Sequence, residues 1–459
     1  MPALKQFRSK QASLWQSAVD RAVSTGAAAS SPAAGLEDTA PAAPVRPPQD
    51  DPAVLAGNEI AASLDAGVMP EAPPPPSAAA GFQETVAFCS KTALRIAEAR
   101  VQSIFSGNTQ QLKALQEEIG AKFGGCDPQW VEVIAEYVKN RVGSIHIPYR
   151  VHNTLDDFVI ADERFPDNAR IAIVGDWGTG EDGARRLLSQ IAAKNPDVVI
   201  HLGDVYYSGT QHEFQNYFYP IWRDVLGLPD VPWGGKLAGH SKPATFTLSG
   251  NHDMYAGGAP YYTVLDMIGQ PASYFCLRNT DWQFIALDTG KNDANPTAAG
   301  KNVTFIEDTE VDWLKHQVAG AGTRKTVLLS HHQLYTAFEN EKIGDGFVND
   351  KLLANTGDIL PQVTAWFWGH EHNLVIFDNP PHVLGRCAGH GAFPVGVDEL
   401  GKLGGGFAIK NVKLALDPTG GLFQHGYIMM ELTGNRAVVR YFQFDSASGA
   451  ELEIFTENL

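Results

Sequence analysis

Between residues 170 and 375, five short runs of apolar, β-forming residues each end in a cluster of polar side chains. The runs read IAIVGDWG, VVIHLGDVYY, TFTLSGNHD, TVLLSHH and FWGHEH. Ligands of open α/β sheets bind outside the carboxyl ends of the strands, so clusters that are far apart along the chain can converge there. Glycines precede most of the polar residues, which suits a sharp turn from strand to loop. The pattern predicts one α/β domain with a single polar crevice.

The segments around these clusters favour parallel strands joined by helices. Arg170–Val174 and Val198–Leu202 are predicted strands, and the segment EDGARRLLSQIAAKN between them is a predicted helix, which makes a βαβ unit. In the tail, the turn signal TGNR joins the predicted strands Gly426–Leu432 and Ala437–Phe444 into a hairpin. Further strands are predicted at Ala244–Leu248, Gln283–Leu287, Thr326–Leu329 and Thr364–Trp368.

Three parts of the chain differ in composition. Residues 1–80 are rich in Ala and Pro, and we expect a largely disordered arm and linker there, because such a segment buries too little apolar surface to order itself. The first residues, MPALKQFRSKQASLWQSAVDRAV, fit either a short amphipathic helix or a frayed terminus. Residues 81–165 show helical periodicity and predict a small three-helix module and its connection, a candidate site for a protein partner. Residues 166–459 form the predicted catalytic domain.

The net charge and the hydropathy of the chain limit the kinds of partner that it can bind and the cellular location that we expect for it. The chain has 35 Lys and Arg residues and 52 Asp and Glu residues, a formal net charge of −17, which argues against nucleic acid or an anionic membrane as a partner. No run approaches the roughly 20 apolar residues that span a bilayer. No signal peptide is recognisable, so we expect a cytoplasmic protein. The four cysteines are scattered, which predicts free thiols and no disulfide scaffold.

The polar residues at the strand ends form a mixed set of oxygen and nitrogen donors without thiolate. Such a set excludes an iron–sulfur cluster and argues against a structural zinc ion. The donors are too many for one ion with an open position, but they suit two adjacent ions that share a bridging carboxylate. The candidate donors at these strand ends are Asp176, Asp204, Tyr207, Asn251, His252, His331, His332, His370 and His372.

The ordered motifs GDWG, GDVYY, GNHD, LLSH and GHEH resemble those of the calcineurin-like metallophosphoesterases, and among these they are most similar to the purple acid phosphatases. The resemblance covers Ile171 to about Val375 and implies an α/β/β/α sandwich of two mixed sheets. The common metallophosphoesterase pattern has a His two residues after the first Asp, where this chain has Gly178. The resemblance implies that Tyr207, three residues after Asp204, takes its place as a phenolate ligand.

The same resemblance implies how the ligands divide between two ions. The ligands of a ferric ion would be Asp176, Asp204, Tyr207 and His372. The ligands of a divalent iron, zinc or manganese ion would be Asp204 as the bridge, Asn251, His331 and His370. His252 would contact the phosphate or protonate the leaving group.

The activity that the resemblance implies is hydrolysis of small phosphate monoesters at acid pH, with a metal-bound hydroxide attacking phosphorus in line. The two cations would offset the acidity of the chain locally. Two alternatives stay open: a phosphodiesterase or nucleotide hydrolase on the same centre, or a slow metallo-domain that serves an interaction role. The family also suggests a location outside the cytoplasm as the alternative.

Three further polar residues adjoin the predicted ligands. His332 follows His331 and is a candidate either for supporting a metal ligand without binding the metal itself or for donating a proton, with a position facing solvent or the loop as the alternative. His201 precedes the end of its strand and is expected to pack in the interior, away from metal. Asp253 is expected either to orient His252 or to cap a turn.

Overall fold

The computed structural model describes residues 147–459 except 295–302, 345, 379, 381, 396–401, 411, 413, 417–421 and 446–447. The predicted arm, the linker and the three-helix module up to residue 146 lie outside the described residues, as do Cys89 and Cys126. None of the helices in the described segments is long and apolar enough to cross a bilayer.

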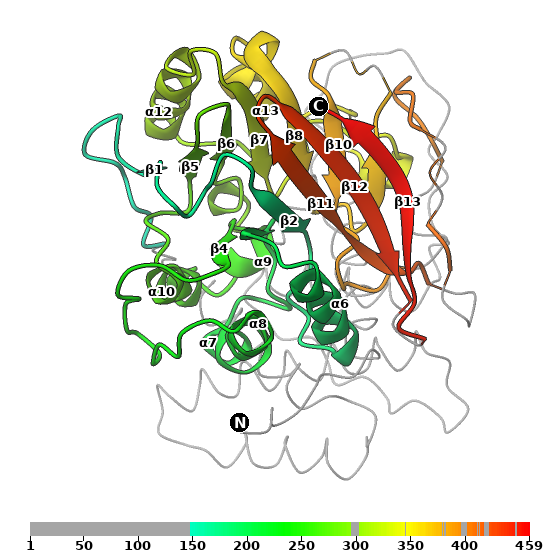
Figure 1. The fold of residues 1–459 in the computed structure, drawn as a ribbon. Coiled ribbons are helices and arrows are strands. Elements are labelled where there is room, and N and C mark those ends of the chain that lie inside the picture. Colours follow the sequence, from blue (N-terminus) through cyan, green and yellow to red (C-terminus); the bar gives the residue numbers. More distant parts are fainter. Residues whose placement is uncertain are drawn as a thin grey trace, which may run out of the picture. The chain divides into compact units, whose positions relative to one another are not determined.

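One mixed sheet of the described domain contains the first and the last strands of the predicted catalytic region (Figure 1). Its strands are β2 (Arg170–Val174), β3 (Val198–His201), β4 (Ala244–Thr247), β11 (His425–Thr433), β12 (Arg436–Phe444) and β13 (Glu451–Asn458). Their order across the sheet is β13-β12-β11-β2-β3-β4. Strands β2, β3 and β4 are parallel, whereas β11 is antiparallel to both β2 and β12, and β13 is antiparallel to β12.

The second mixed sheet is built from the middle of the chain. Its strands are β1 (Val159–Ile160), β5 (Phe275–Arg278), β6 (Trp282–Ala286), β7 (Lys325–Ser330), β8 (Val363–Trp368), β9 (Leu374–Ile376) and β10 (Gly385–Ala388). Their order is β1-β5-β6-β7-β8-β10-β9. Strands β6, β7, β8 and β10 are parallel, and the antiparallel pairs β5–β6 and β9–β10 flank them.

The two sheets pack face to face, and helices cover their outer faces. Alternate side chains of a strand point to opposite faces, so Ile171 and Ile173 of β2 lie in the core between the sheets, while Ala172 and Val174 face the helices. The helices on the first sheet are α6 (Asp182–Ala193), α8 (Tyr219–Leu226) and α10 (Ala259–Ile268). Those on the second are α12 (Asp308–Ala319) and α13 (Asp350–Thr356). The predicted α/β/β/α sandwich is confirmed.

Shorter helices occupy the loops between these elements. Helix α7 (Gln211–Glu213) continues into a π-helical turn, Phe214–Phe218, that leads directly into α8. Helix α9 (Asn251–Met254) follows β4 after three intervening residues, 248–250. Short 3₁₀ helices span Lys291–Asp293, Glu339–Glu341 and Leu360–Gln362.

The predicted strands are all present, with ends within one residue of the expected ones. Five strands were not predicted, because each departs from the usual pattern: β1 and β9 are very short, β5 reads FCLR, β10 contains Gly and Arg, and β13 is a charged, half-exposed strand at the sheet edge. Strand β1 lies within the predicted connection and pairs with β5.

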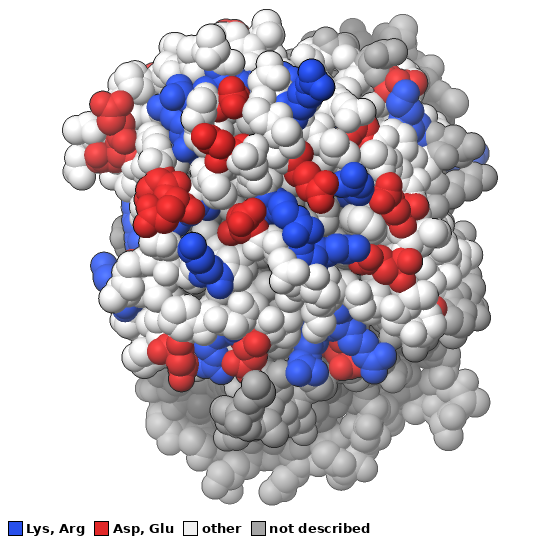
Figure 2. Space-filling view, viewed as in Figure 1, with Lys and Arg blue, Asp and Glu red and all other residues white. Residues whose placement is uncertain are grey.

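Basic and acidic side chains are interspersed over the face of the domain shown in Figure 2, which is the face that carries β11–β13 in Figure 1. Ion pairs anchored on these strands join Arg440 with Glu431 at 2.5 Å and Lys194 with Glu451 at 2.5 Å. The net negative charge of the chain is therefore not gathered into a patch on the described part of this face.

Candidate metal centre

The predicted ligands follow strands of both sheets. In the first sheet, Asp176 comes after β2, Asp204 after β3, and Asn251 after β4. In the second sheet, His331 follows β7, and the loop after β8 holds two more histidines, His370 and His372. The distances below show that these loops meet, as the strand-end clusters predict.

The carboxylates of Asp176 and Asp204 lie against His331 in the interior. The three side chains are fully buried, and their possible ligand atoms lie within 4.8 Å of one another. Nε2 of His331 is 3.3 Å from Oδ2 of Asp204. Nε2 of His372 lies 3.5 Å from Oδ1 of Asp176. These contacts bring together donors that are almost two hundred residues apart in sequence.

Unusual backbone conformations concentrate at these residues. Asp176, Asp204, His370 and His372 have φ angles of 56°, 77°, 68° and 49°, in the left-handed region that side chains with a Cβ rarely adopt. Each such residue costs of order 1 kcal/mol or more, and such strain is characteristic of functional sites. The polar residues themselves thus make the sharp turns that the sequence analysis assigned to the preceding glycines.

The glycines serve mainly to allow close approach. A Cβ on Gly250 would lie 1.9 Å from Oδ1 of Asp204, and one on Gly369 would lie 2.6 Å from Oδ2 of Asp176. Among the glycines that precede predicted ligands, Gly203 does have a positive φ, of 105°. The loops can therefore pack around the two carboxylates only where side chains are missing.

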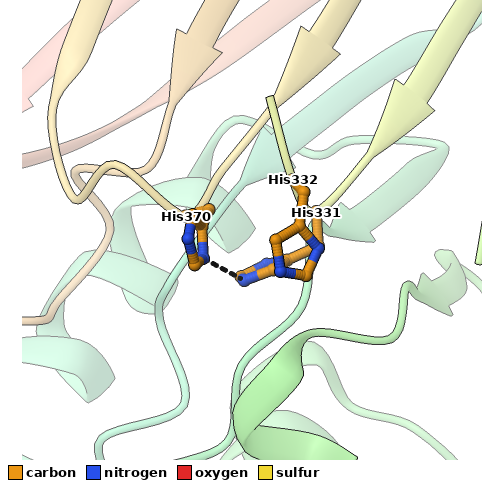
Figure 3. Close-up of side chains that lie close together, drawn as sticks. All are labelled: His331, His332 and His370. Carbon is orange, nitrogen blue, oxygen red and sulfur yellow. Dashed lines mark hydrogen bonds between the residues drawn. The ribbon is translucent and has the colours of Figure 1, made fainter. Parts of the chain in front are cut away.

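A second group of donors surrounds His331 (Figure 3). Its Nε2 lies 3.0 Å from Oδ1 of Asn251 and 3.2 Å from Nδ1 of His370. Its Nδ1 lies 2.9 Å from the carbonyl oxygen of Leu202, to which it can donate, so Nε2 is the ring nitrogen that faces the other donors. The amide of Asn251 donates from Nδ2 to Tyr255 at 2.5 Å, which turns Oδ1 toward the histidines.

The phenol that contacts the carboxylate of Asp176 belongs to Tyr206. Its oxygen lies 3.0 Å from Oδ1 of Asp176 and 3.0 Å from Nε2 of His372. Tyr207, the predicted ligand, is buried and holds the loop through its backbone: its N–H donates to Glu213 and its carbonyl lies 2.6 Å from Nδ1 of His252. Tyr206 and Tyr207 are adjacent in the sequence, and only the spacing of the family motif favoured Tyr207 as the ligand.

The candidate proton donor His252 lies beside the carboxylate of Asp204, the predicted bridge. Its Nδ1 can donate to the carbonyl of Tyr207, and its Nε2 lies 4.0 Å from Oδ2 of Asp204. The following residue, Asp253, does not orient His252. Its carboxylate accepts from the backbone N–H groups of Asp204, Val205 and Gly250 at 3.0, 3.0 and 2.7 Å. Asp253 therefore fixes the loop that presents Asp204.

Burial and the charges of neighbouring side chains shift the pKa values of the predicted ligands. Burial raises the pKa of Asp176 to about 7. Burial alone would lower the pKa of His331, but the neighbouring carboxylates, Asp204 first, raise it to about 9. Burial lowers the pKa of His372 to about 3 and that of His370 well below its usual range, which keeps both imidazoles neutral. A neutral imidazole is the form that binds metal ions.

The donors fit a pair of metal ions. Oδ2 of Asp204 is buried without a hydrogen bond of good geometry from the described residues, and its near neighbour is Nε2 of His331 at 3.3 Å, so a metal ion held by both side chains would satisfy this oxygen. Oxygen and imidazole donors without thiolate suit iron, manganese or zinc. Asp204 stands between the two groups of donors, as a shared ligand does.

Comparison with known proteins identifies one domain within the chain. Residues 169–374 match the family model described as calcineurin-like phosphoesterase. The chain contains a calcineurin-like phosphoesterase domain. The segment that the resemblance covered, Ile171 to about Val375, coincides with this phosphoesterase domain.

Individual relatives of the phosphoesterase domain are distant. Tartrate-resistant acid phosphatase type 5 of Mus musculus is 25% identical over 256 residues, which cover 49% of this chain and 72% of the mouse protein. Glycerophosphodiester phosphodiesterase GpdQ of Enterobacter lignolyticus is 23% identical over 186 residues, 40% of this chain and 58% of that protein. The solved structure of PhoD aligns with a TM-score of 0.43 and 12% identity, over 64% of this chain and 69% of that chain.

Several residues that support the site of the phosphoesterase domain were not found from sequence. Glu213 accepts from the N–H of Ser208 at 3.1 Å and of Thr210 at 2.9 Å, and so holds the loop of the two tyrosines. The capping-box pattern TQHE at Thr210–Glu213 was a usable signal for it. Thr289 and Asp293, which contact His332, follow β6 without any motif.

Proposed function

We propose that this chain hydrolyses phosphate monoesters at a centre of two metal ions. The observation that carries the proposal is the convergence of carboxylate, amide and imidazole donors from five strand ends around Asp204, whose buried Oδ2 lies 3.3 Å from Nε2 of His331. A set of that kind, shared by a bridging carboxylate, suits two adjacent cations.

The proposed ligands divide as the purple acid phosphatases suggest. Asp176, Asp204 and His372 would hold one ion, proposed to be ferric iron, together with a tyrosine phenolate. Asn251, His331 and His370 would hold a divalent iron, zinc or manganese ion, with Asp204 as the bridge. The motif spacing assigns the phenolate to Tyr207, whereas the contacts of Tyr206 with Asp176 and His372 favour Tyr206.

Bound cations would supply the Lewis-acid polarisation of the phosphate ester and offset its negative charge. The residues of the chain supply orientation and protons. The carbonyl of Tyr207 holds Nδ1 of His252, which fixes the ring so that its Nε2 edge lies toward the bridging carboxylate. From this position His252 would contact the phosphate or protonate the leaving group.

A small monoester is the proposed substrate, with a diester or nucleotide as the second candidate. The acid phosphatase of Mus musculus supports the first, because it is matched over 72% of its length. The phosphodiesterase GpdQ supports the second, although it is matched over only 58%. The net charge of −17 favours small esters over long polyanions.

Paired assays separate the two candidates. The full chain would be loaded with iron, manganese or zinc and tested with p-nitrophenyl phosphate and with bis(p-nitrophenyl) phosphate. We expect the monoester to give the larger kcat/KM and a chelator to abolish turnover until metal is restored. A larger kcat/KM for the diester would replace the monoesterase proposal with the phosphodiesterase.

A ligand variant tests whether the centre carries the activity. Asp204→Asn is expected to lower kcat/KM more than about 100-fold. This is a larger loss than usually follows when a residue that only hydrogen-bonds to a metal ligand is removed. Asp312→Asn, on the exposed face of α12, is the control and is expected to keep full activity. Turnover that survives in Asp204→Asn would place the chemistry elsewhere.

A further inference from the structure

His332 lies against both histidines proposed for the second ion (Figure 3). The centroid of its ring is 4.4 Å from that of His370, with the planes inclined at 41°, and 4.8 Å from that of His331, nearly perpendicular at 87°. Its side chain is fully buried. The ring of His332 therefore forms one wall of the space that the imidazole of His370 can occupy.

Both ring nitrogens of His332 are occupied by other residues of the chain. The backbone N–H of His332 donates to Oγ1 of Thr289 at 3.1 Å, and Nδ1 of the ring lies 3.0 Å from the same oxygen. Nε2 lies 3.0 Å from Oδ2 of Asp293, so each ring nitrogen has a hydrogen-bond partner within the chain. A ring nitrogen of His332 lies within 4.8 Å of possible ligand atoms of His331 and His370, but both of its nitrogens are already engaged by Thr289 and Asp293.

The partners of His332 are themselves held firmly. Thr289 is fully buried, Asp293 is 5% exposed, and the carbonyl of Thr289 accepts from the hydroxyl of Thr304 at 2.6 Å. A Cβ on Gly290 would lie 2.5 Å from the carbonyl oxygen of Gly250, so the loop after β6 packs closely against the loop that carries Asn251. One loop thus supports the surroundings of two proposed ligands.

We propose that Thr289, Asp293 and His332 form an outer support of the second metal site. Of the two roles that the sequence left open for His332, support and proton donation, the contacts favour support: His332 is a positioning residue that holds the imidazole of His370 beside His331 and is not itself a ligand. The inference rests on the proposed function for the existence of a second ion, but it concerns binding of that ion and not turnover. Partners of this kind, one shell outside the ligands, commonly change metal affinity 10- to 100-fold.

Metal binding by the full chain tests this role without any substrate. Metal-free protein would be titrated with Mn²⁺ by calorimetry, with equilibrium dialysis for the number of ions bound. Asp293→Ala releases Nε2 of His332, and we expect the second Mn²⁺ to bind roughly 10- to 100-fold more weakly while the first is unchanged. Asp293→Asn keeps a carbonyl acceptor and is expected to restore most of the affinity. Asp312→Ala is the surface control.

A second variant distinguishes support from ligation. His332→Phe keeps a ring beside His370 but has no nitrogen, so we expect it still to bind two Mn²⁺ ions per chain. Loss of one ion in His332→Phe would make His332 a ligand and overturn the proposal. Unchanged affinity in a folded Asp293→Ala protein would overturn it as well.

The same titrations keep this proposal separate from the proposed function. A chain that binds two Mn²⁺ ions, responds to Asp293→Ala and hydrolyses no phosphate ester would contradict the proposed function alone. A wild-type chain that binds a single ion would contradict both.

Discussion

The phenolic oxygen of Tyr206 lies 3.0 Å from Oδ1 of Asp176. It also lies 3.0 Å from Nε2 of His372, so one phenol spans two proposed ligands of the first ion. Tyr207 has the spacing expected of the family ligand, but it engages the loop through its backbone N–H and carbonyl. Geometry and motif therefore point to different members of the tyrosine pair.

Visible spectra of the iron-loaded protein can decide between the two tyrosines. We expect a band from charge transfer between tyrosinate and ferric iron that disappears in Tyr206→Phe and persists in Tyr207→Phe. The reverse result would restore the assignment made from motif spacing. A colourless protein that is active with manganese or zinc would exclude the ferric site but not the phosphoesterase.

Asp253 is expected to matter for stability more than for chemistry. Asp253→Asn replaces one carboxylate oxygen by an NH₂ group, which faces backbone donors of Asp204, Val205 or Gly250. Because a buried donor is then left without an acceptor, we expect the free energy of unfolding to fall by about 2 kcal/mol. Urea denaturation measures this, and Asp312→Asn is the exposed control. A loss of less than about 0.5 kcal/mol, the range of ordinary surface changes, would contradict this role.

His201 is expected to make the domain sensitive to acid. It packs among the rings of Trp177, Phe218 and Trp222. Burial lowers the pKa of His201 from 6.5 to about 3. Between these two pH values His201 is therefore protonated in the unfolded chain but neutral in the folded chain. Its contribution to stability is complete above pH 6.5 and is lost progressively as the pH falls from 6.5 toward 3.

His201→Phe removes this proton uptake. Between pH 7 and pH 5 the wild type is expected to lose about 2 kcal/mol more unfolding free energy than the variant. Urea denaturation of both proteins at the two pH values gives the comparison. Equal losses would show that His201 is not protonated on unfolding in this range.

The pair Arg386–Glu457 is expected to fix the edge strand β13 to the second sheet. Two hydrogen bonds join the guanidinium to the carboxylate, at 2.7 and 2.6 Å, and the side chain of Arg386 is 2% exposed. Glu457→Gln leaves a buried cation without its counter-charge, so we expect a loss of about 3 kcal/mol in unfolding free energy.

A neighbouring residue on the same strand provides the control for this pair. Glu453 lies 3.7 Å from Arg440 in a half-exposed ion pair, and Glu453→Gln is expected to change stability by less than about 1 kcal/mol. The double change Arg386→Met with Glu457→Leu is expected to recover much of the loss. If both single changes had the same small effect, the buried pair would not anchor β13.

The strands and the donors could be predicted because they depend on local signals. Each of the five runs is a buried strand followed by a polar residue, and this pattern is visible within ten residues of sequence. The residues that hold the ligands in place could not be predicted in this way. Thr289 and Asp293 matter because the loop after β6 reaches His332 across the sheet, and no local pattern records such a contact.

Two further features of the structure, the orientation of Tyr206 and the strand β10, could not be predicted from the sequence because they depend on contacts between distant residues. Adjacent tyrosines are equally apolar, so only the path of the loop determines that Tyr206 faces Asp176. Strand β10 has an arginine at a buried position, which is unfavourable unless its partner is known, and Glu457 lies far along the chain. The role of residues before 147 stays a prediction.

The position of β2 between β3 and β11 has a consequence for the order in which the protein is made. On the ribosome, every proposed ligand is synthesised before β11, so the nascent chain has the complete donor set while β2 still presents an open hydrogen-bonding edge. Open edges of this kind invite pairing with other chains. Strand β2, which leads into the donor loop at Asp176, therefore pairs with β11 only late in synthesis, and until then its open edge is exposed to pairing with other chains.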